Sequence, residues 1–264
     1  MKKEAYDDFS GDYDRFVNWE ERLSAEMPFL LKKLQSAVPE KGQPARVLDA
    51  ACGTGMHAIA LAEAGNQVSG ADISGEMIRA AKENARAAQL EVEFKTAGFG
   101  MLTEAFGNSS SCPFDMIICL GNSLPHLLSQ ESILGALTDI AKCLRPGGYL
   151  LIQNRNFYAV MAEKNRWLGT QSQVEGTHEW LFLRFYDFDP DGLITFNIIR
   201  LHKSGNEPWT QKELVTRLFP LKQAVLLLLL KKAGFHQISC FGQMGSGTFD
   251  RMKSGNLVIT AVKI

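Results

Sequence analysis

The stretch Val47-Leu48-Asp49-Ala50-Ala51-Cys52-Gly53-Thr54-Gly55 decides the fold expected of this chain. Residues 46–51 form an apolar run dense enough for a buried parallel strand. Two glycines, Gly53 and Gly55, follow it, and residues 56–64 have apolar positions at helical spacing. A strand, a glycine turn and a helix open a doubly wound sheet, whose ligands bind at the carboxyl edge.

The spacing of the glycines excludes a dinucleotide fingerprint. The pattern G-x-G-x-x-G would need glycine where Ala51 and Met56 stand. A second predicted strand, residues 67–72, ends in Asp72, where an acid can accept both ribose hydroxyls of an adenosyl group. The alternative is a helix-capping role for Asp72, since Ser74 and Glu76 follow it.

Bulk composition bounds the class of protein. The 264 residues predict one large domain, or one domain with an insertion. A net charge of −1 does not favour binding to nucleic acid or to an anionic membrane. The charged residues at the N-terminus predict no signal peptide, and the apolar run 224–230 is too short to span a bilayer. Five cysteines without a CxxC pair predict reduced thiols in a cytoplasm: Cys52, Cys112, Cys119, Cys143 and Cys240.

The rest of the chain alternates helix and strand patterns and then changes. Further core strands are predicted at 90–97, 114–120, 149–154, 236–242 and 256–263, and helices at 74–88, 131–144 and 225–233. An Arg145-Pro146-Gly147-Gly148 turn precedes the fifth strand. Strands at 179–188, 193–201 and 209–218 predict an antiparallel insert that covers the cleft. The fold class is therefore α/β, with a doubly wound, seven-stranded, mostly parallel sheet.

The N-terminal residues predict helices, and three regions follow from the whole pattern. Tyr6, Phe9, Tyr13 and Phe16 fall at helical spacing, either as a helix packed on the domain or as a lid with Tyr13 or Trp19 near the substrate. A second helix at 20–37 contains Pro28, which predicts a break or a fresh start there. The expected regions are a helical lid (1–40), a core (41–157 and 221–264) and a substrate cap (158–220).

Polar residues follow two predicted strands at the expected ligand edge. The fourth strand leads into Asn122 and His126, and the fifth ends at Arg155. An arginine there is a bidentate receptor for a carboxylate, unless it forms a surface salt bridge. His126 is either a proton-transfer group or a loop histidine bonded to backbone. The five histidines are scattered, with no H-E-x-x-H, so no metal site is expected.

Four landmarks resemble those of the class I S-adenosyl-L-methionine (SAM) methyltransferases: the 49–55 turn, Asp72, Phe114-Asp115 and the 144–148 segment. They cover residues 45–155 and imply a Rossmann-like fold with SAM as cofactor and S-adenosyl-L-homocysteine (SAH) as product. The cofactor residues implied are Asp49, Ala51, Gly53, Gly55, Asp72, Ile73, Met77, Gly98, Phe99 and Leu120. Phe99 would stack on the adenine, or else fold back on the core.

Two further stretches are similar to the glycine and glycine/sarcosine N-methyltransferases. They are Ile118-Cys119-Leu120-Gly121-Asn122-Ser123-x-x-His126-Leu127 and Asn154-Arg155-Asn156-Phe157. The resemblance implies that Asn122 and Arg155 hold the amino-acid carboxylate, that Arg22 binds the SAM carboxylate, and that Leu120 and His126 lie near SAM. The chain departs from the family at Gln153, where an aspartate is usual, and its substrate-site tyrosines are open among Tyr6, Tyr13 and Tyr186.

The sequence therefore predicts a cytoplasmic SAM-dependent methyltransferase acting on the nitrogen of a small carboxylate-bearing amine such as glycine or sarcosine. Such a displacement needs alignment and desolvation more than acid or base. The alternatives are O- or C-methylation of a small molecule, and a SAM-binding sensor without turnover. No nucleic-acid or membrane partner is expected, and the oligomeric state is open. Residues 226–230 are either a buried helix or a dimer face.

Overall fold

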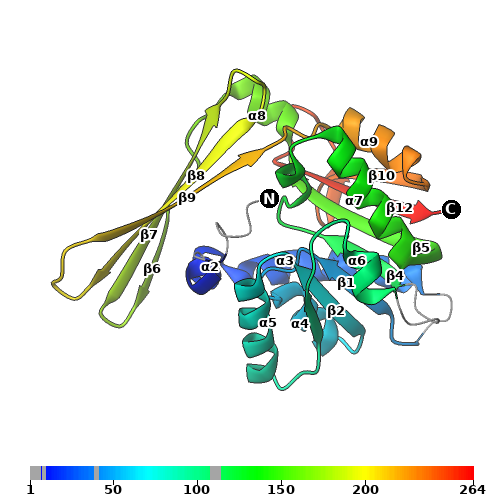
Figure 1. The fold of residues 1–264 in the computed structure, drawn as a ribbon, viewed down its shortest axis with the longest axis horizontal. Helices are drawn as coiled ribbons and strands as arrows, with labels where there is room; N and C mark the ends of the chain where they lie inside the picture. Colours follow the sequence, from blue (N-terminus) through cyan, green and yellow to red (C-terminus); the bar gives the residue numbers. More distant parts are fainter. Residues whose placement is uncertain (1–6, 8–9, 39–41, 108–113) are drawn as a thin grey trace.

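The computed structural model describes residues 7, 10–38, 42–107 and 114–264. Its centre is a sheet in the order β11-β10-β12-β5-β4-β1-β2-β3 (Figure 1). The parallel strands are β1 (Arg46–Ala50), β2 (Gln67–Asp72), β3 (Glu93–Thr96), β4 (Phe114–Cys119) and β5 (Leu144–Arg155). The antiparallel edge is β12 (Asn256–Lys263), β10 (Phe235–Gln243) and β11 (Ser246–Thr248). The predicted doubly wound, mostly parallel fold is confirmed, and β11 adds one short strand to the seven expected.

The direction of the chain reverses between β1 and β4. From β1 the strand order runs through β2 to the β3 edge, and then β4 pairs on the other side of β1. Such a reversal opens a crevice at the carboxyl ends of the two strands, because their connections leave in opposite directions. This crevice is where the 51–55 turn and the 121–126 segment meet.

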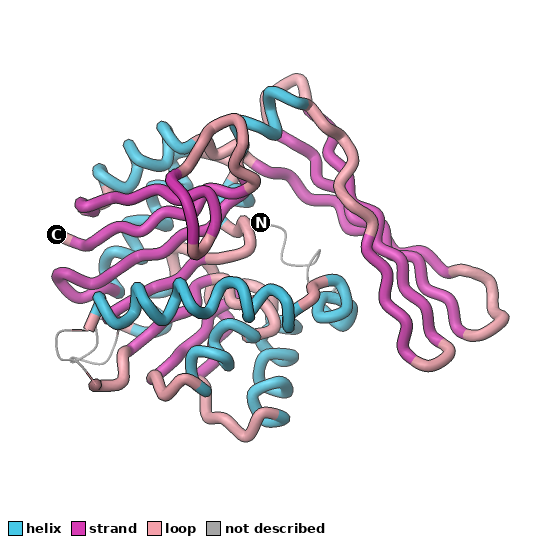
Figure 2. Tube along the Cα trace, turned by 180° about the vertical axis from the view of Figure 1, so that it is seen from behind, coloured by secondary structure: helices cyan, strands magenta, loops and turns pink. Residues whose placement is uncertain are grey.

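Helices cover both faces of the sheet (Figures 1 and 2). On one face, α3 (Trp19–Ala37), α4 (Met56–Glu63) and α5 (Gly75–Ala87) pack against a core that includes Met116 and Ile118. On the other, α6 (Leu102–Phe106), α7 (Gln130–Cys143) and α9 (Gln223–Lys232) pack against Ile117 and Cys119. Successive β4 residues thus enter opposite cores, which explains why the sequence shows an unbroken apolar run.

Two expectations about element boundaries were wrong. The helix α3 runs through the exposed Pro28 without a break, because its buried residues Phe29, Leu30 and Leu34 hold it against the sheet. The Arg145–Gly148 turn lies inside β5, as an irregularity in its pairing with β4: Phe114 pairs with Leu144, and Met116 pairs with Tyr149. Gly147 accommodates the irregularity with a φ of 73°.

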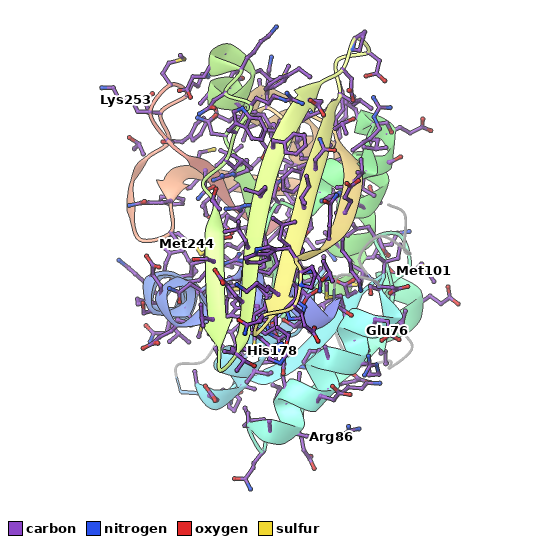
Figure 3. All side chains as sticks on the ribbon, turned by 90° about the vertical axis from the view of Figure 1, so that its left-hand side faces the viewer. Glu76, Arg86, Met101, His178, Met244 and Lys253 are labelled. Atoms are coloured by element: carbon purple, nitrogen blue, oxygen red, sulfur yellow. The ribbon has the colours of Figure 1, made fainter. Side chains whose placement is uncertain are left out.

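A separate antiparallel sheet extends away from the core (Figures 1 and 2), and Figure 3 faces it directly. Its strands are β6 (Gln171–Glu175), β7 (His178–Phe188), β8 (Ile194–Ser204) and β9 (Thr210–Leu218), in that order. We call it the cap sheet. The sequence predicted three of these strands but not β6, nor the helix α8 (Phe157–Glu163) that precedes it. The division into lid, core and cap stays a prediction.

The N-terminal segment lies between the core and the cap sheet. Within the described residues it is α2 (Ser10–Phe16), which leads into α3; Tyr6, Phe9 and Cys112 lie outside the described residues. In α9, Leu226, Leu229 and Leu230 are buried and Leu228 is half exposed, so one side of this helix packs on the core. A dimer face on its other side stays a prediction. No helix in the described part of the chain is long and apolar enough to cross a membrane.

Candidate active site

A cavity of about 620 Å³ opens at the carboxyl ends of β1, β4 and β5. Its walls come from the 51–53 turn, α2, α3, the segment after β4, the end of β5 and the inner face of the cap sheet. This volume lies within the roughly 300–1,000 Å³ usual for small-molecule sites. The sheet, the N-terminal helices and the cap therefore all contribute to one site.

The turn after β1 requires glycine at Gly55 for two reasons. Its φ is 81°, and a Cβ there would lie 2.8 Å from Cζ of Phe94. Gly53 also has a positive φ, and a Cβ there would lie 3.7 Å from the ring of Tyr13. Ala51 adopts a φ of 68° despite its Cβ, a strained conformation of the kind that concentrates at ligand sites.

Two buried carboxyl groups, Asp49 and Asp72, flank this turn. Asp72 accepts hydrogen bonds from the backbone N–H of Gly53 at 3.0 Å and of Ser74 at 2.9 Å. Burial raises the pKa of the Asp72 carboxyl. Burial, together with the charge of Asp72, raises the pKa of Asp49 to about 7. Ser74 itself caps α5 by accepting from Met77, so Asp72 does not supply that cap.

Arg22 of α3 reaches the cavity as part of a polar network. Its Nε donates to Glu26 at 3.3 Å, and its Nη2 donates to Gln153 Oε1 at 3.3 Å. Gln153 in turn donates to Glu26 at 2.9 Å, and His57 Nε2 lies 2.7 Å from the same carboxylate. Burial lowers the pKa of His57. Burial opposes ionisation of Glu26, but its hydrogen bond with His57 and the charge of Arg22 leave its pKa lowered.

This network gives a physical reason for the amide at position 153. An aspartate there would place a second carboxylate near Glu26, and the two negative charges would repel each other. Gln153 instead accepts from Arg22 and donates to Glu26. No sequence pattern indicated His57, whereas the spacing of Arg22 and Glu26, four residues apart on one helix, was a usable signal.

Asn122 and Arg155 meet at the ends of β4 and β5. Asn122 has a φ of 71°, and its Oδ1 accepts the backbone N–H of Arg155 at 3.0 Å. Both residues line the cavity, and no ion pair forms between Arg155 and a carboxylate of the described residues. The salt-bridge alternative for Arg155 is therefore not what the geometry shows. The bond from Arg155 pins the Asn122 side chain to the end of β5.

His126 is a buried histidine whose ring contacts the cap sheet. It lies in a short 3-10 helix, η1 (Leu124–Leu127), and its Nδ1 is 3.2 Å from Oγ1 of Thr216 on β9. Burial lowers the pKa of His126 to about 4. The imidazole is therefore neutral at pH 7, and it is a weak proton acceptor there.

All of the sequence-predicted site residues line the cavity except Gly55, Ile73, Gly98 and Phe99. Phe99 is partly buried and packs against the hydrophobic core. The contacts of these four residues with the cofactor stay predictions. Among the candidate tyrosines, Tyr13 and Tyr186 line the cavity, as does Trp19. Within the described ranges, no three His, Cys, Asp or Glu side chains gather as a metal site.

Besides Glu26 and His57, sequence reasoning gave no role to Asn154 on β5 or to Arg184 on β7, and both line the cavity. Arg184 shares one face of β7 with the buried Trp180, Phe182 and Tyr186, since side chains two apart point the same way. The alternation of side chains along β7 could have indicated this residue, because Arg184 is the one charged residue on a strand face that is otherwise apolar from Trp180 to Tyr186.

These residues fit SAM. The two buried carboxyl groups beside the glycine turn have raised pKa values, and no described residue donates a hydrogen bond to Asp49. They can accept hydrogen bonds from an adenosyl ribose. Arg22 can receive a carboxylate at the other side of the turn.

Comparisons with known proteins identify the family of this chain. The methyltransferase domain model matches residues 47–148. The chain is 31% identical to the glycine/sarcosine N-methyltransferase of Aphanothece halophytica, over 91% of this chain and 83% of that protein. It is 29% identical to that of Parasynechococcus marenigrum (strain WH8102), over 91% and 79%. The fold also resembles the CcbJ methyltransferase from Streptomyces caelestis, with a TM-score of 0.75 at 21% identity and full coverage of both chains.

The fold and the site together define a SAM-dependent methyltransferase of class I. Its methyl donor is SAM. Within that class, the chain belongs to the family of the glycine/sarcosine N-methyltransferases.

Proposed function

We propose that this enzyme methylates the nitrogen of a small amine that carries a carboxylate, with glycine and sarcosine as the first candidates. The observation that carries the proposal is the Arg155 guanidinium at the end of β5, which lines the cavity without a carboxylate partner among the described residues. Arg155 and Asn122 would hold the acceptor carboxylate. The named activity of the relatives supports an amine as the acceptor.

The chain contributes binding, alignment and exclusion of water. SAM, when bound, supplies an activated methyl group on its sulfonium. Arg155 anchors one end of the acceptor, so the nitrogen at the other end has a restricted set of orientations. Phe196 and Ile198 of β8 give the cap wall an apolar surface that excludes water. The amine must bind neutral, and His126, with its low pKa, is not required to take its proton.

The test is methyl transfer to glycine and sarcosine by the full chain and by Arg155→Lys. Lysine keeps the charge but loses the bidentate geometry, so kcat/KM should fall at least about 10-fold, while SAH affinity measured by calorimetry is retained. Arg217→Lys is the matched control, because Arg217 pairs with Asp189 and Asp191 on the exposed side of the cap sheet. Unchanged kinetics in Arg155→Lys contradict carboxylate capture.

An acceptor screen on the wild-type enzyme separates the remaining possibilities. Methylation of oxygen or carbon in preference to nitrogen contradicts the proposal. So does tight SAH binding with no turnover on any carboxylated amine, which is the behaviour of a sensor.

A further inference from the structure

Two guanidinium groups face the acceptor side of the cavity: Arg155 at the end of β5 and Arg184 on β7. Burial lowers the pKa of Arg184, and the nearby positive charge of Arg155 lowers it further. Neither arginine forms an ion pair with a carboxylate of the described residues. Two cations therefore share one wall with no negative charge to balance them.

The Arg184 side chain is held in place and still has an unused donor. Its guanidinium lies 4.8 Å above the ring of Phe16, and its Nη2 donates to the carbonyl of Gly169 at 3.2 Å. Its Nε is buried and has no hydrogen-bond partner. A buried guanidinium donor without an acceptor is costly, so a ligand that accepts from it would relieve that cost.

Asn154, next to Arg155 on β5, is an independent indication of a ligand. The residue is only 1% exposed, it lines the cavity, and neither its amide nitrogen nor its amide oxygen has a partner. Buried amides are almost always hydrogen-bonded in folded proteins. An acceptor with several polar groups would satisfy both atoms.

The cavity wall also contains four acidic residues, each with surroundings of its own. Asp49 and Asp72 flank the glycine turn, and Glu26 is engaged by Arg22, His57 and Gln153. Glu21, on the exposed side of α3, accepts from Asn18. None of these four acids forms an ion pair with Arg155 or Arg184, so within the described residues the positive charge of the two arginines is not compensated.

We infer that the natural acceptor carries a second acidic group, and that Arg184 binds this group while Arg155 binds the first. The inference rests on the proposed function and names its substrate class: an amine with two anionic groups, such as an amino dicarboxylate. One carboxylate would neutralise one guanidinium and leave the other partly buried and unpaired, which is the less stable arrangement.

The test compares isosteric acceptors that differ by one charge, namely L-aspartate with L-asparagine and L-glutamate with L-glutamine. For the wild-type enzyme, kcat/KM for the acid should exceed that for the amide by about 10- to 100-fold, since the amide loses a charged hydrogen bond. Arg184→Gln should bring this ratio close to one. Calorimetric titration of the SAH-bound enzyme with L-aspartate should show the same loss of affinity, while SAH affinity is unchanged.

Arg166→Gln is the matched control. Arg166 also belongs to the 158–220 region, but it pairs with Asp187 at 2.6 Å, on the face of β7 opposite Arg184, and should keep the preference for acids. Equal use of acid and amide by the wild type, or an unchanged ratio in Arg184→Gln, overturns the inference. Methylation of glycine or sarcosine without any preference for dicarboxylates overturns the inference of a second acidic group but leaves the proposed function standing. Failure with every carboxylated amine overturns the proposed function as well.

Discussion

Asp49 shows how a single buried residue links the site to stability. Its pKa of about 7 in the folded chain is well above the ordinary value, about 4, of an exposed aspartate. The folded state therefore binds the proton more tightly than the unfolded state does. Below about pH 4 the carboxyl is protonated in both states, and it does not change the free energy of unfolding. As the pH rises from about 4 toward 7 the free energy of unfolding falls, and above about pH 7 the full destabilisation by Asp49 is present.

Asp49→Asn should consequently stabilise the ligand-free enzyme at pH 8 by about 1–3 kcal/mol, or a few °C in Tm. The gain should shrink as the pH falls toward 4, because the wild-type carboxyl is then protonated as well. Thermal unfolding across pH 4–8 measures it, and SAH titration should show weaker binding. A Tm difference that does not vary with pH would contradict the raised pKa.

Gly55 illustrates a residue whose substitution fails for two separable reasons. Gly55→Ala adds a left-handed alanine and a clash with Phe94, so the free energy of unfolding should fall by about 2–5 kcal/mol. Gly65→Ala is the control: its φ is 85°, but no atom lies within 4 Å of the added Cβ, so only the backbone cost of about 1–2 kcal/mol remains. Urea unfolding of both variants measures the difference. An equal loss of unfolding free energy in the two variants would show that Phe94 shifts to accommodate the added Cβ at no cost.

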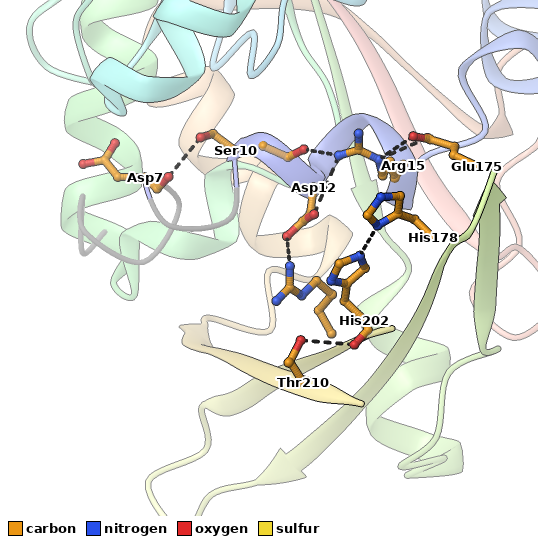
Figure 4. A network of polar contacts seen from close by, with 10 residues as sticks. Asp7, Ser10, Asp12, Arg15, Glu175, His178, His202 and Thr210 are labelled. Atoms are coloured by element: carbon orange, nitrogen blue, oxygen red, sulfur yellow. Dashed lines mark hydrogen bonds and ion pairs between the residues drawn. The ribbon is translucent and has the colours of Figure 1, made fainter. Parts of the chain in front are cut away.

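At the scale of elements, α2 connects the cap sheet to the cofactor turn. Asp12 pairs with Arg200 of β8 at 2.8 Å, and Arg15 pairs with Glu175 of β6 at 3.0 Å (Figure 4). On its other side, Asp14 accepts from Thr54 in the glycine turn at 2.5 Å. The helix is seven residues long, so these side-chain contacts rather than its own hydrogen bonds keep it formed.

A double-mutant cycle should rank the two ion pairs of α2. The Asp12 and Arg200 side chains are 12% and 11% exposed, so Asp12→Asn with Arg200→Gln should give a coupling of about 1–3 kcal/mol. The Arg15–Glu175 pair is 33% and 43% exposed, and its coupling should stay below about 1 kcal/mol because solvent screens it. Urea unfolding measures both cycles. A larger coupling in the exposed pair would contradict this account.

At the scale of the whole molecule, one cavity joins the core, α2–α3 and the cap sheet, so a bound ligand should stabilise all three together. SAH at about 100 times its Kd should add about 2.7 kcal/mol, which corresponds to a Tm rise of about 5–10 °C. At the same SAH concentration, Asp72→Asn should show less than half of that rise, because a ribose-binding carboxylate is lost. An equal rise in the variant would remove Asp72 from the cofactor site.

Local patterns in the sequence determined the doubly wound core, the glycine turn and the polar strand ends, because buried parallel strands and tight turns need particular residues at adjacent positions. They also placed Asn122, His126 and Arg155 at one edge of the sheet. Only the tertiary structure decided that Pro28 stays within a helix, that Glu26 binds both Arg22 and His57, and that Arg184 and Arg155 line the same cavity. These features depend on packing between segments far apart in the chain, and the free energy of such contacts leaves no periodic trace in either segment alone.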